Sequence, residues 1–139
     1  MLDYAAPQHF PRASAPMNDV MERYIANIND PDPEFAATAF ADSYTGEDPV
    51  GTGLLELTRQ GSMFDLDLFD VPFTPKKAEL IAPVRTTFAN SAAMAFTFWA
   101  EVDGREITID IIDVMTFDAD GKIVHIDAHW GVNTIRLVD

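Results

Sequence analysis

Alternating apolar and polar positions dominate the second half of the chain, which is the pattern of β-strands with one buried face. The longest such run is residues 105–117, whose odd positions are Ile107, Ile109, Ile111, Asp113, Met115 and Phe117. Residues 92–102 alternate in the same way, with one face formed by Met94, Phe96, Phe98, Ala100 and Val102. Asp103-Gly104 between the two runs is a two-residue hairpin signal. We therefore expect two long antiparallel strands side by side.

Further strands are predicted on both sides of this hairpin. Residues 76–88 read as extended, with a break at Pro83. Asp118-Ala-Asp-Gly121 is a turn sequence that leads into a last strand over residues 122–132. The even positions of that strand are Val124, Ile126, Ala128 and Trp130, and the odd positions are Ile123, His125, Asp127 and His129. The even face is predicted to be the buried one.

The first half of the chain has helical periodicity. Residues 17–28 predict an amphipathic helix with Asn18 as its N-cap and one stripe formed by Val20, Met21, Tyr24, Ile25 and Ile28. Asp32 is a candidate N-cap for a second helix that has Pro33 at its first position and runs to about Phe40. A short strand over 43–47, a turn over 47–51 and a short helix over 53–60 are expected next. Residues 61–75 show no clear pattern.

Helices followed by antiparallel strands predict an α+β domain. We expect the N-terminal helices to pack on one face of a curved antiparallel or mixed sheet, so that the domain forms a cone around an apolar pocket. This single domain is expected to span residues 17–139. Residues 1–16 carry Pro7, Pro11 and Pro16 and lack the pattern of a secretory signal, so a flexible leader is expected there.

Composition narrows the classes of function. A chain of 139 residues with 47% hydrophobic residues can bury a core, and it contains no apolar run of transmembrane length. The absence of cysteine excludes disulfides and thiol chemistry and fits a cytoplasmic protein. A net charge of −14 repels phosphate backbones and anionic membranes, so nucleic-acid and membrane partners are not expected.

One carboxylate lies where the pattern calls for an apolar side chain. Asp113 shares its face with isoleucines, a methionine and a phenylalanine, so burial should raise its pKa and favour the neutral acid. A neutral acid can donate a hydrogen bond to a developing oxyanion. The alternative to a functional role is a structural one, in which Asp113 is buried and hydrogen-bonded to backbone groups. Tyr24 on the helix stripe and Asp48 in the turn are the two other candidates for such chemistry.

Three stretches carry a resemblance to a known family. They are Met21-Glu-Arg-Tyr-Ile25, Glu47-Asp-Pro-Val-Gly51, and Ile109-Asp-Ile-Ile-Asp-Val-Met-Thr-Phe-Asp118 followed by Trp130. In this order, and in a chain of this size, they resemble the ketosteroid isomerases of the nuclear-transport-factor-2-like (SnoaL-like) superfamily. The neutral Asp beside a Tyr is the standard example from that family, and its chemistry comes with the resemblance.

The resemblance implies a cofactor-free shift of a carbon–carbon double bond in a 3-keto-Δ5-steroid or a similar apolar ketone. Asp48 would be the proton shuttle, and Tyr24 with protonated Asp113 would be the oxyanion hole. The implied walls of the substrate pocket are Phe40, Met94, Phe96, Phe98, Ala100, Met115 and Trp130. No cofactor or metal is implied, and a homodimer through the sheet face is expected.

The sequence also departs from the family. Some members support the oxyanion tyrosine with two further tyrosines, and by alignment those positions hold Phe40 and Thr58 here. Phe40 cannot donate a hydrogen bond to Tyr24. The segment between Asp48 and Arg59 is shorter than usual by roughly half a dozen residues, in a loop where length is easily changed. The identity of the steroid, and whether the substrate is one, is therefore left open.

Other functions compete with the isomerase. The superfamily also contains lyases, hydrolases and cyclases that act on apolar small molecules, and a non-catalytic, ligand-binding dimer is a further alternative. A one-residue bulge in the last strand would turn its histidines into the cavity, as some of those enzymes require.

His125, Asp127 and His129 also have the spacing of a metal site on one strand face, although a polar outer face is the more common explanation. Asp65, Asp67 and Asp70 lack the glycine and glutamate of a calcium loop.

Overall fold

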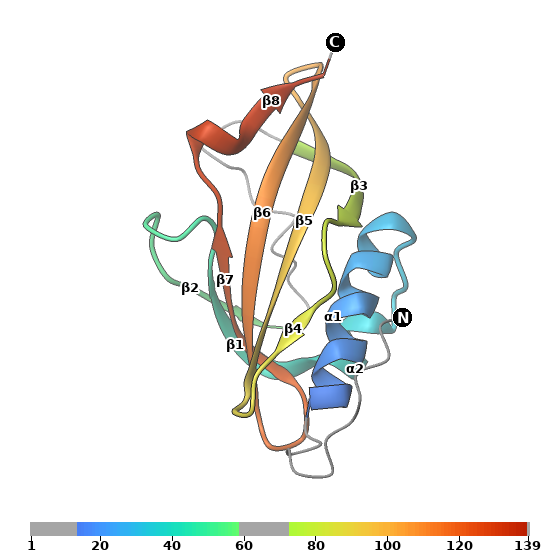
Figure 1. The fold of residues 1–139 in the computed structure, drawn as a ribbon, viewed down its shortest axis with the longest axis vertical. Helices are drawn as coiled ribbons and strands as arrows, with labels where there is room; N and C mark the ends of the chain where they lie inside the picture. Colours follow the sequence, from blue (N-terminus) through green and yellow to red (C-terminus); the bar gives the residue numbers. More distant parts are fainter. Residues whose placement is uncertain (1–13, 59–72, 139) are drawn as a thin grey trace.

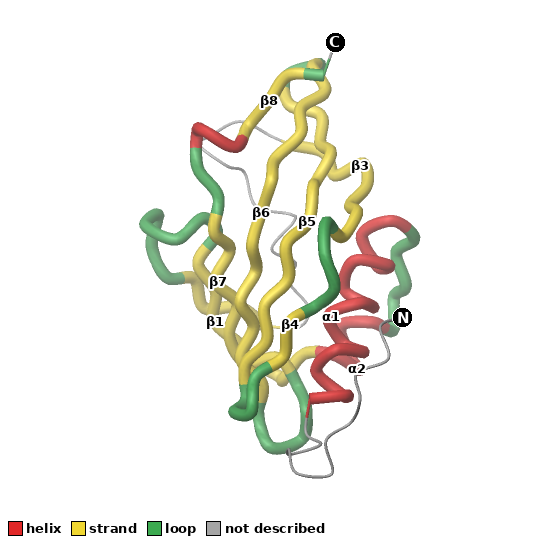
Figure 2. The backbone as a smooth tube through the Cα atoms, viewed as in Figure 1, coloured by secondary structure: helices red, strands yellow, loops and turns green. Residues whose placement is uncertain are grey.

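The computed structural model describes residues 14–58 and 73–138, which form an α+β fold with two helices beside a curved mixed sheet (Figure 1). The elements are α1 (Ser14–Asn29), α2 (Phe35–Ala39), β1 (Phe40–Glu47), β2 (Leu55–Thr58), β3 (Phe73–Leu80), β4 (Arg85–Thr86), β5 (Ser91–Val102), β6 (Arg105–Phe117), β7 (Ile123–His129), the 3-10 helix η2 (Val132–Thr134) and β8 (Ile135–Leu137). Figure 2 shows α1 and α2 together on one side of the strands, with the short η2 apart from them next to β8. The predicted fold class is confirmed.

The order of the strands is β2-β1-β7-β6-β5-β3, with β4 paired to β5 and β8 paired to β6. All pairs are antiparallel except β1 with β7, which run parallel. The β5–β6 hairpin forms as predicted, and its turn residues Asp103 and Gly104 both have positive φ, at 53° and 76°. In its register Met94 faces Asp113 and Ala92 faces Met115, so the two predicted apolar faces coincide.

The first half of the chain corrects several predicted boundaries. α1 begins at Ser14, so Asn18 lies inside the helix and is not its N-cap; Pro16 is tolerated because it falls in the first turn. Asp32 forms a turn in which its side chain accepts from the backbone N–H of Glu34, and α2 begins only at Phe35. The predicted helix over 53–60 is wrong, because Leu55–Thr58 pairs with β1 as a strand.

The last strand contains a bulge. Thr116 pairs with His125 and Phe117 pairs with Ile123, so Val124 is the extra residue. Ile123 is consequently the buried side chain, and Val124 is only half-buried, which corrects the predicted faces at this position. The bulge precedes His125, so the outward orientation of the residues that follow is unchanged.

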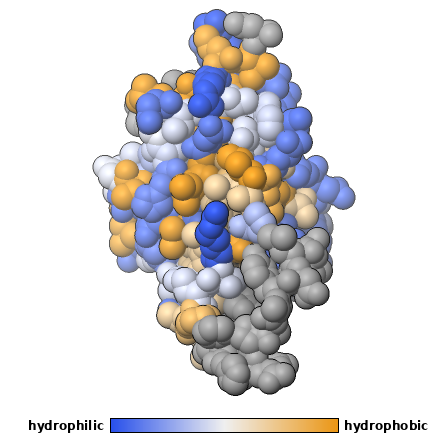
Figure 3. Space-filling model, viewed as in Figure 1, coloured by the Kyte–Doolittle hydropathy of each residue, from blue (hydrophilic) through white to orange (hydrophobic). Residues whose placement is uncertain are grey.

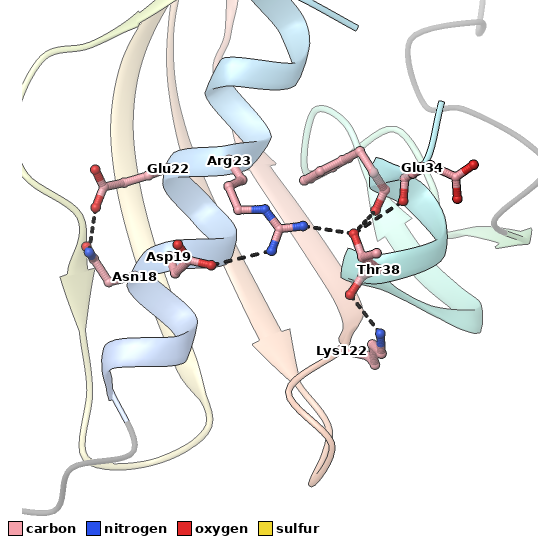
Figure 4. Close-up of polar contacts among 8 residues, drawn as sticks. Asn18, Asp19, Glu22, Arg23, Glu34, Thr38 and Lys122 are labelled. Atoms are coloured by element: carbon pink, nitrogen blue, oxygen red, sulfur yellow. Dashed lines mark hydrogen bonds and ion pairs between the residues drawn. The ribbon is translucent and has the colours of Figure 1, made fainter. Parts of the chain in front are cut away.

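Two polar contacts fix the helices on the sheet. The side-chain amide of Asn29, at the end of α1, donates to the carbonyl of Ala78 and accepts from its N–H, both at 2.8 Å. At the other contact, Arg23 Nη2 donates to Thr38 Oγ1 at 2.8 Å, and Lys122 Nζ donates to the Thr38 carbonyl at 2.7 Å (Figure 4). Thr38 therefore joins α1, α2 and the β6–β7 turn immediately before β1 begins.

The core lies between the helices and the inner face of β5, β6 and β7. Its largest fully buried side chains are Met21, Met94, Met115, Ile123 and Ile126. Apolar and polar side chains are mixed on the face seen in Figure 3.

No helix within residues 14–58 and 73–138 combines the length and apolarity needed to cross a membrane. The predicted leader over residues 1–16 is too long by three residues, because Ser14–Asn29 forms α1. Residues 1–13 and the three aspartates at 65, 67 and 70 lie outside the described residues.

Candidate active site

Tyr24 projects from the middle of α1 into the core and is 6% exposed. Its ring packs edge-on against Phe35, with 6.2 Å between ring centroids, and lies 6.5 Å from the ring of Phe40. Burial raises the pKa of the phenol well above its usual value, and the negative charges of Asp113 and Asp48 raise it further. The neutral phenol, a hydrogen-bond donor, is therefore strongly favoured.

Asp113 is the one buried charged or polar residue among the described residues, with 3% exposure. It lies on the inner face of β6, with Met94 and Ala128 as its cross-strand neighbours. Burial raises its pKa well above the usual value, and the charge of Asp48 adds to the effect. A buried acid of this kind is unusual and suggests a functional role.

Asp48 follows the end of β1 and is half-buried. Its Oδ1 accepts a hydrogen bond of 2.6 Å from Trp130 Nε1, which reaches across from the end of β7. Burial raises the pKa of this carboxyl group, whereas the hydrogen bond from Trp130 lowers it. Two opposed effects of this sort are how a carboxylate is adjusted to exchange protons.

The turn that carries Asp48 is held by its own polar groups. The carboxylate of Glu47 accepts from the backbone N–H groups of Gly51 and Gly53, and Thr52 Oγ1 donates to the Pro49 carbonyl at 2.7 Å. The N–H of Val50 donates to the Ala128 carbonyl at 2.9 Å, which attaches the turn to β7. The short loop thus places the carboxylate beside the inner face of the sheet.

Comparison with known proteins places this geometry in a family. Residues 21–126 match the family model of the SnoaL-like domain. The chain belongs to the SnoaL-like family. A steroid Δ-isomerase from Nocardioides simplex is 30% identical over 117 residues, covering 84% of this chain and 91% of that protein.

A solved structure shares the SnoaL-like fold. It is of SalBIII, an epoxide hydrolase/cyclase-like enzyme with a role in pyran ring formation in the polyether salinomycin. Its TM-score is 0.70 at 20% identity, covering 88% of this chain and 95% of that chain. At this identity the likeness concerns the fold alone.

The predicted wall residues of this SnoaL-like domain are all found on its inner side. Six are buried in the core cluster, and Trp130 is partly buried against it; the six are Phe40, Met94, Phe96, Phe98, Ala100 and Met115. The six belong to β1, β5 and β6, and Asp113 is itself on β6. The face is apolar apart from the groups described above.

The histidines of the SnoaL-like domain lie on the other side. His125 Nδ1 is 2.6 Å from Thr45 Oγ1, its Nε2 is 2.9 Å from Asp127 Oδ1, and His129 is exposed. Across the described ranges, no three metal-ligating side chains are close enough to hold an ion. The alternative in which these histidines enter the cavity is therefore not supported.

Sequence reasoning missed one titratable residue of the SnoaL-like domain. Tyr44, on β1, is 5% exposed, burial raises its pKa, and its charge is among those that raise the pKa of Tyr24. The sequence signal for Tyr44 was its parity: in a strand it lies on the same face as Gly46 and Asp48, two and four positions later. The predicted strand over 43–47 was too short to assign its faces.

Proposed function

We propose that this protein is a cofactor-independent isomerase that shifts a carbon–carbon double bond next to a ketone through a dienolate. The proposal is carried by one observation: Asp113, buried on the inner face of β6, lies within electrostatic range of Tyr24 and Asp48. A neutral phenol and a neutral acid facing one carboxylate suit the stabilisation of an enolate oxygen.

The proposed reaction moves one proton. The Asp48 carboxylate takes a proton from the carbon between the ketone and the double bond, and the electron pair of that C–H bond flows to the ketone oxygen. Tyr24 and Asp113 donate hydrogen bonds to this oxygen as its charge develops. Asp48 then returns the proton two carbons along, the dienolate collapses to a conjugated ketone, and the protein regains its starting protonation state.

The proposed substrate is a 3-keto-Δ5-steroid or a similar apolar ketone. The relative at 30% identity is a steroid Δ-isomerase, and the inner face of β5 and β6 offers apolar walls to a flat ligand. Phe40 and Thr58 stand where some members of the family have tyrosines, and the loop is shorter. These differences are compatible with a substrate that has another ring system. The homodimer and the cytoplasmic location expected from the sequence stay predictions.

A cyclase, lyase or hydrolase reaction is less well supported. Some of those enzymes use a His-Asp pair and others an Asp-Arg-Asp set inside the cone. Here His125 instead bonds Thr45 and Asp127 on the outer face, which does not favour a His-Asp pair. A purely binding role gives no reason for placing an acid with a raised pKa between apolar neighbours, since burying a polar group there costs about 1–3 kcal/mol.

The proposal is tested with the wild-type protein and a Δ5-3-ketosteroid. Growth of the ultraviolet absorbance of the conjugated ketone is expected. A phenolic steroid analogue should bind with a perturbed phenol spectrum, and Tyr24→Phe should reduce both the perturbation and kcat, the latter by about 10²–10³-fold. If the analogue binds with an unchanged phenol spectrum and the ketosteroid is not converted, the isomerase proposal is wrong and a binding role remains.

Trp130 should set the pH dependence of the reaction. Its N–H stabilises the Asp48 carboxylate and lowers the pKa of that group, so Trp130→Phe should raise this pKa. The base then loses its proton only at higher pH, and the acidic limb of the kcat/KM profile should move to higher pH.

Trp99→Phe is the matched control for Trp130→Phe. Trp99 is the other tryptophan and lies against Lys77, with 4.4 Å between Nζ and the ring centroid. Its replacement should leave the acidic limb in place. An unmoved limb in Trp130→Phe would mean that Asp48 is not the group that titrates.

A further inference from the structure

The mechanism above makes no use of Tyr44, although this side chain is as deeply buried as Tyr24. It lies on β1, four positions after Phe40 and four before Asp48, and Gly46 is the other buried residue between it and the base. It is thus an aromatic side chain on the same strand that leads into the catalytic turn.

Ring contacts connect Tyr44 to Tyr24. Tyr44 is stacked on Phe40 with 4.5 Å between centroids and a tilt of 38°, and Phe40 lies 6.5 Å from Tyr24. Phe35 closes the group, at 6.0 Å from Phe40 and 6.2 Å from Tyr24. We call Tyr24, Phe35, Phe40 and Tyr44 the aromatic cluster. Such aromatic pairs stabilise the rings beyond the effect of their burial and favour particular ring positions.

The backbone beside the cluster is only partly fixed by the sheet. β1 pairs with β7 at Phe40 and again from Thr45, but five residues of β1 span the same interval as two of β7. A cavity of about 430 Å³ lies along this part of β1, and its lining includes Tyr44, Glu56 and Val124. The other edge of β1 is paired with β2, where Tyr44 faces Leu57, so side-chain packing supplements the ladder only on the side toward β7.

We propose that Tyr44 is a positioning residue, whose ring holds Phe40 against Tyr24 and so keeps the Tyr24 hydroxyl directed at the reacting oxygen. The inference deepens the proposed function and depends on it only where activity is measured. Small displacements of a catalytic group are costly, since about 1 Å can lower a rate by about 10²-fold. In this role the ring of Tyr44 makes the contact, through Phe40.

The test compares two replacements at Tyr44. Tyr44→Leu removes the aromatic stack, and Tyr44→Phe keeps the ring while removing the hydroxyl. Phe117→Leu is the matched control, because Phe117 is an equally buried aromatic on β6 that has no ring contact with Tyr24. Tyr44→Met is a second variant without a ring, should Tyr44→Leu fail to fold.

Two readouts are taken on these variants. The first is steady-state kinetics, in which Tyr44→Leu should lower kcat about tenfold or more, with KM changed less than about twofold and rescue by Tyr44→Phe. The second is the ¹⁹F spectrum of protein labelled with fluorotyrosine, in which the signal of Tyr24 is assigned from its loss in Tyr24→Phe. That signal should move in Tyr44→Leu and stay in place in Tyr44→Phe and Phe117→Leu.

The fluorine readout needs no activity, so it separates the two proposals. A protein without isomerase activity whose Tyr24 signal moves in Tyr44→Leu would contradict the proposed function and support the positioning role. A Tyr24 signal that is unmoved in Tyr44→Leu or Tyr44→Met, or that moves equally in Phe117→Leu, would overturn the positioning role whatever the kinetics.

Discussion

Replacing Asp48 with asparagine is expected to lower kcat for the isomerisation of a Δ5-3-ketosteroid by about 10²–10⁴-fold, the usual contribution of a positioned general base. Asparagine keeps an oxygen that can accept the hydrogen bond from Trp130, so the local geometry should survive. KM should change little, because the loss concerns the transfer of the proton and not the binding of the apolar ligand.

Asp120→Asn is the control for this replacement. Asp120 is an exposed aspartate in the β6–β7 turn, so its variant carries the same change of charge away from the inner face. It should have wild-type kinetics. If Asp48→Asn keeps more than about a tenth of the wild-type kcat, another group must move the proton.

Replacing Asp113 with valine should lower activity and raise stability together. Valine is close in size and suits a strand, but it cannot donate to an oxyanion, so kcat should fall by about 10²–10³-fold. Burying an ionisable acid among apolar neighbours costs about 1–3 kcal/mol, and the free energy of unfolding should rise by a similar amount. Enzyme kinetics and urea unfolding of the same preparation provide both measurements.

The gain in stability should depend on pH with a defined sign. The folded state raises the pKa of Asp113, so the unfolded state loses this proton first as the pH rises. The stability that wild type has near pH 4 is therefore lost progressively toward the higher pKa of the folded state. The difference between Asp113→Val and wild type should grow from pH 4 to pH 8.

Asp110→Val on the opposite face of β6 is the control for this sign. Asp110 accepts hydrogen bonds from Arg136 and Thr97, which lower its pKa. Its removal should cost stability at neutral pH and little at low pH, the reverse of the pattern for Asp113. A difference between Asp113→Val and wild type that stays constant with pH would mean that Asp113 is not held neutral in the fold.

The parts of this site that could be predicted from the sequence are those in long stretches of regular apolar and polar periodicity. The hairpin of β5 and β6 was predictable, because alternation over more than ten residues leaves one register in which both apolar faces agree. Asp113 stood out for the same reason. Tyr24 was placed correctly because its helix has a clear apolar stripe.

Short elements were predicted less well because local signals are weak there. The four residues of β2 have no strong preference of their own, and pairing with β1 decides their structure. The bulge at Val124 depends on how β7 meets β6, which no single strand encodes. Tyr44 was missed because its neighbours in space, Phe40 and Tyr24, are identified only once β1 and α1 are packed together.

The parallel pairing of β1 with β7 has a consequence for synthesis of the protein. The hydrogen bond between Trp130 and Asp48 joins residues 82 positions apart, and the two strands that carry them cannot meet until β5 and β6 have been made. Until Trp130 has been made, the chain has its proposed base without the hydrogen-bond donor of that base. A chain truncated before residue 130 should therefore have the acidic limb of its kcat/KM profile at higher pH than the full chain.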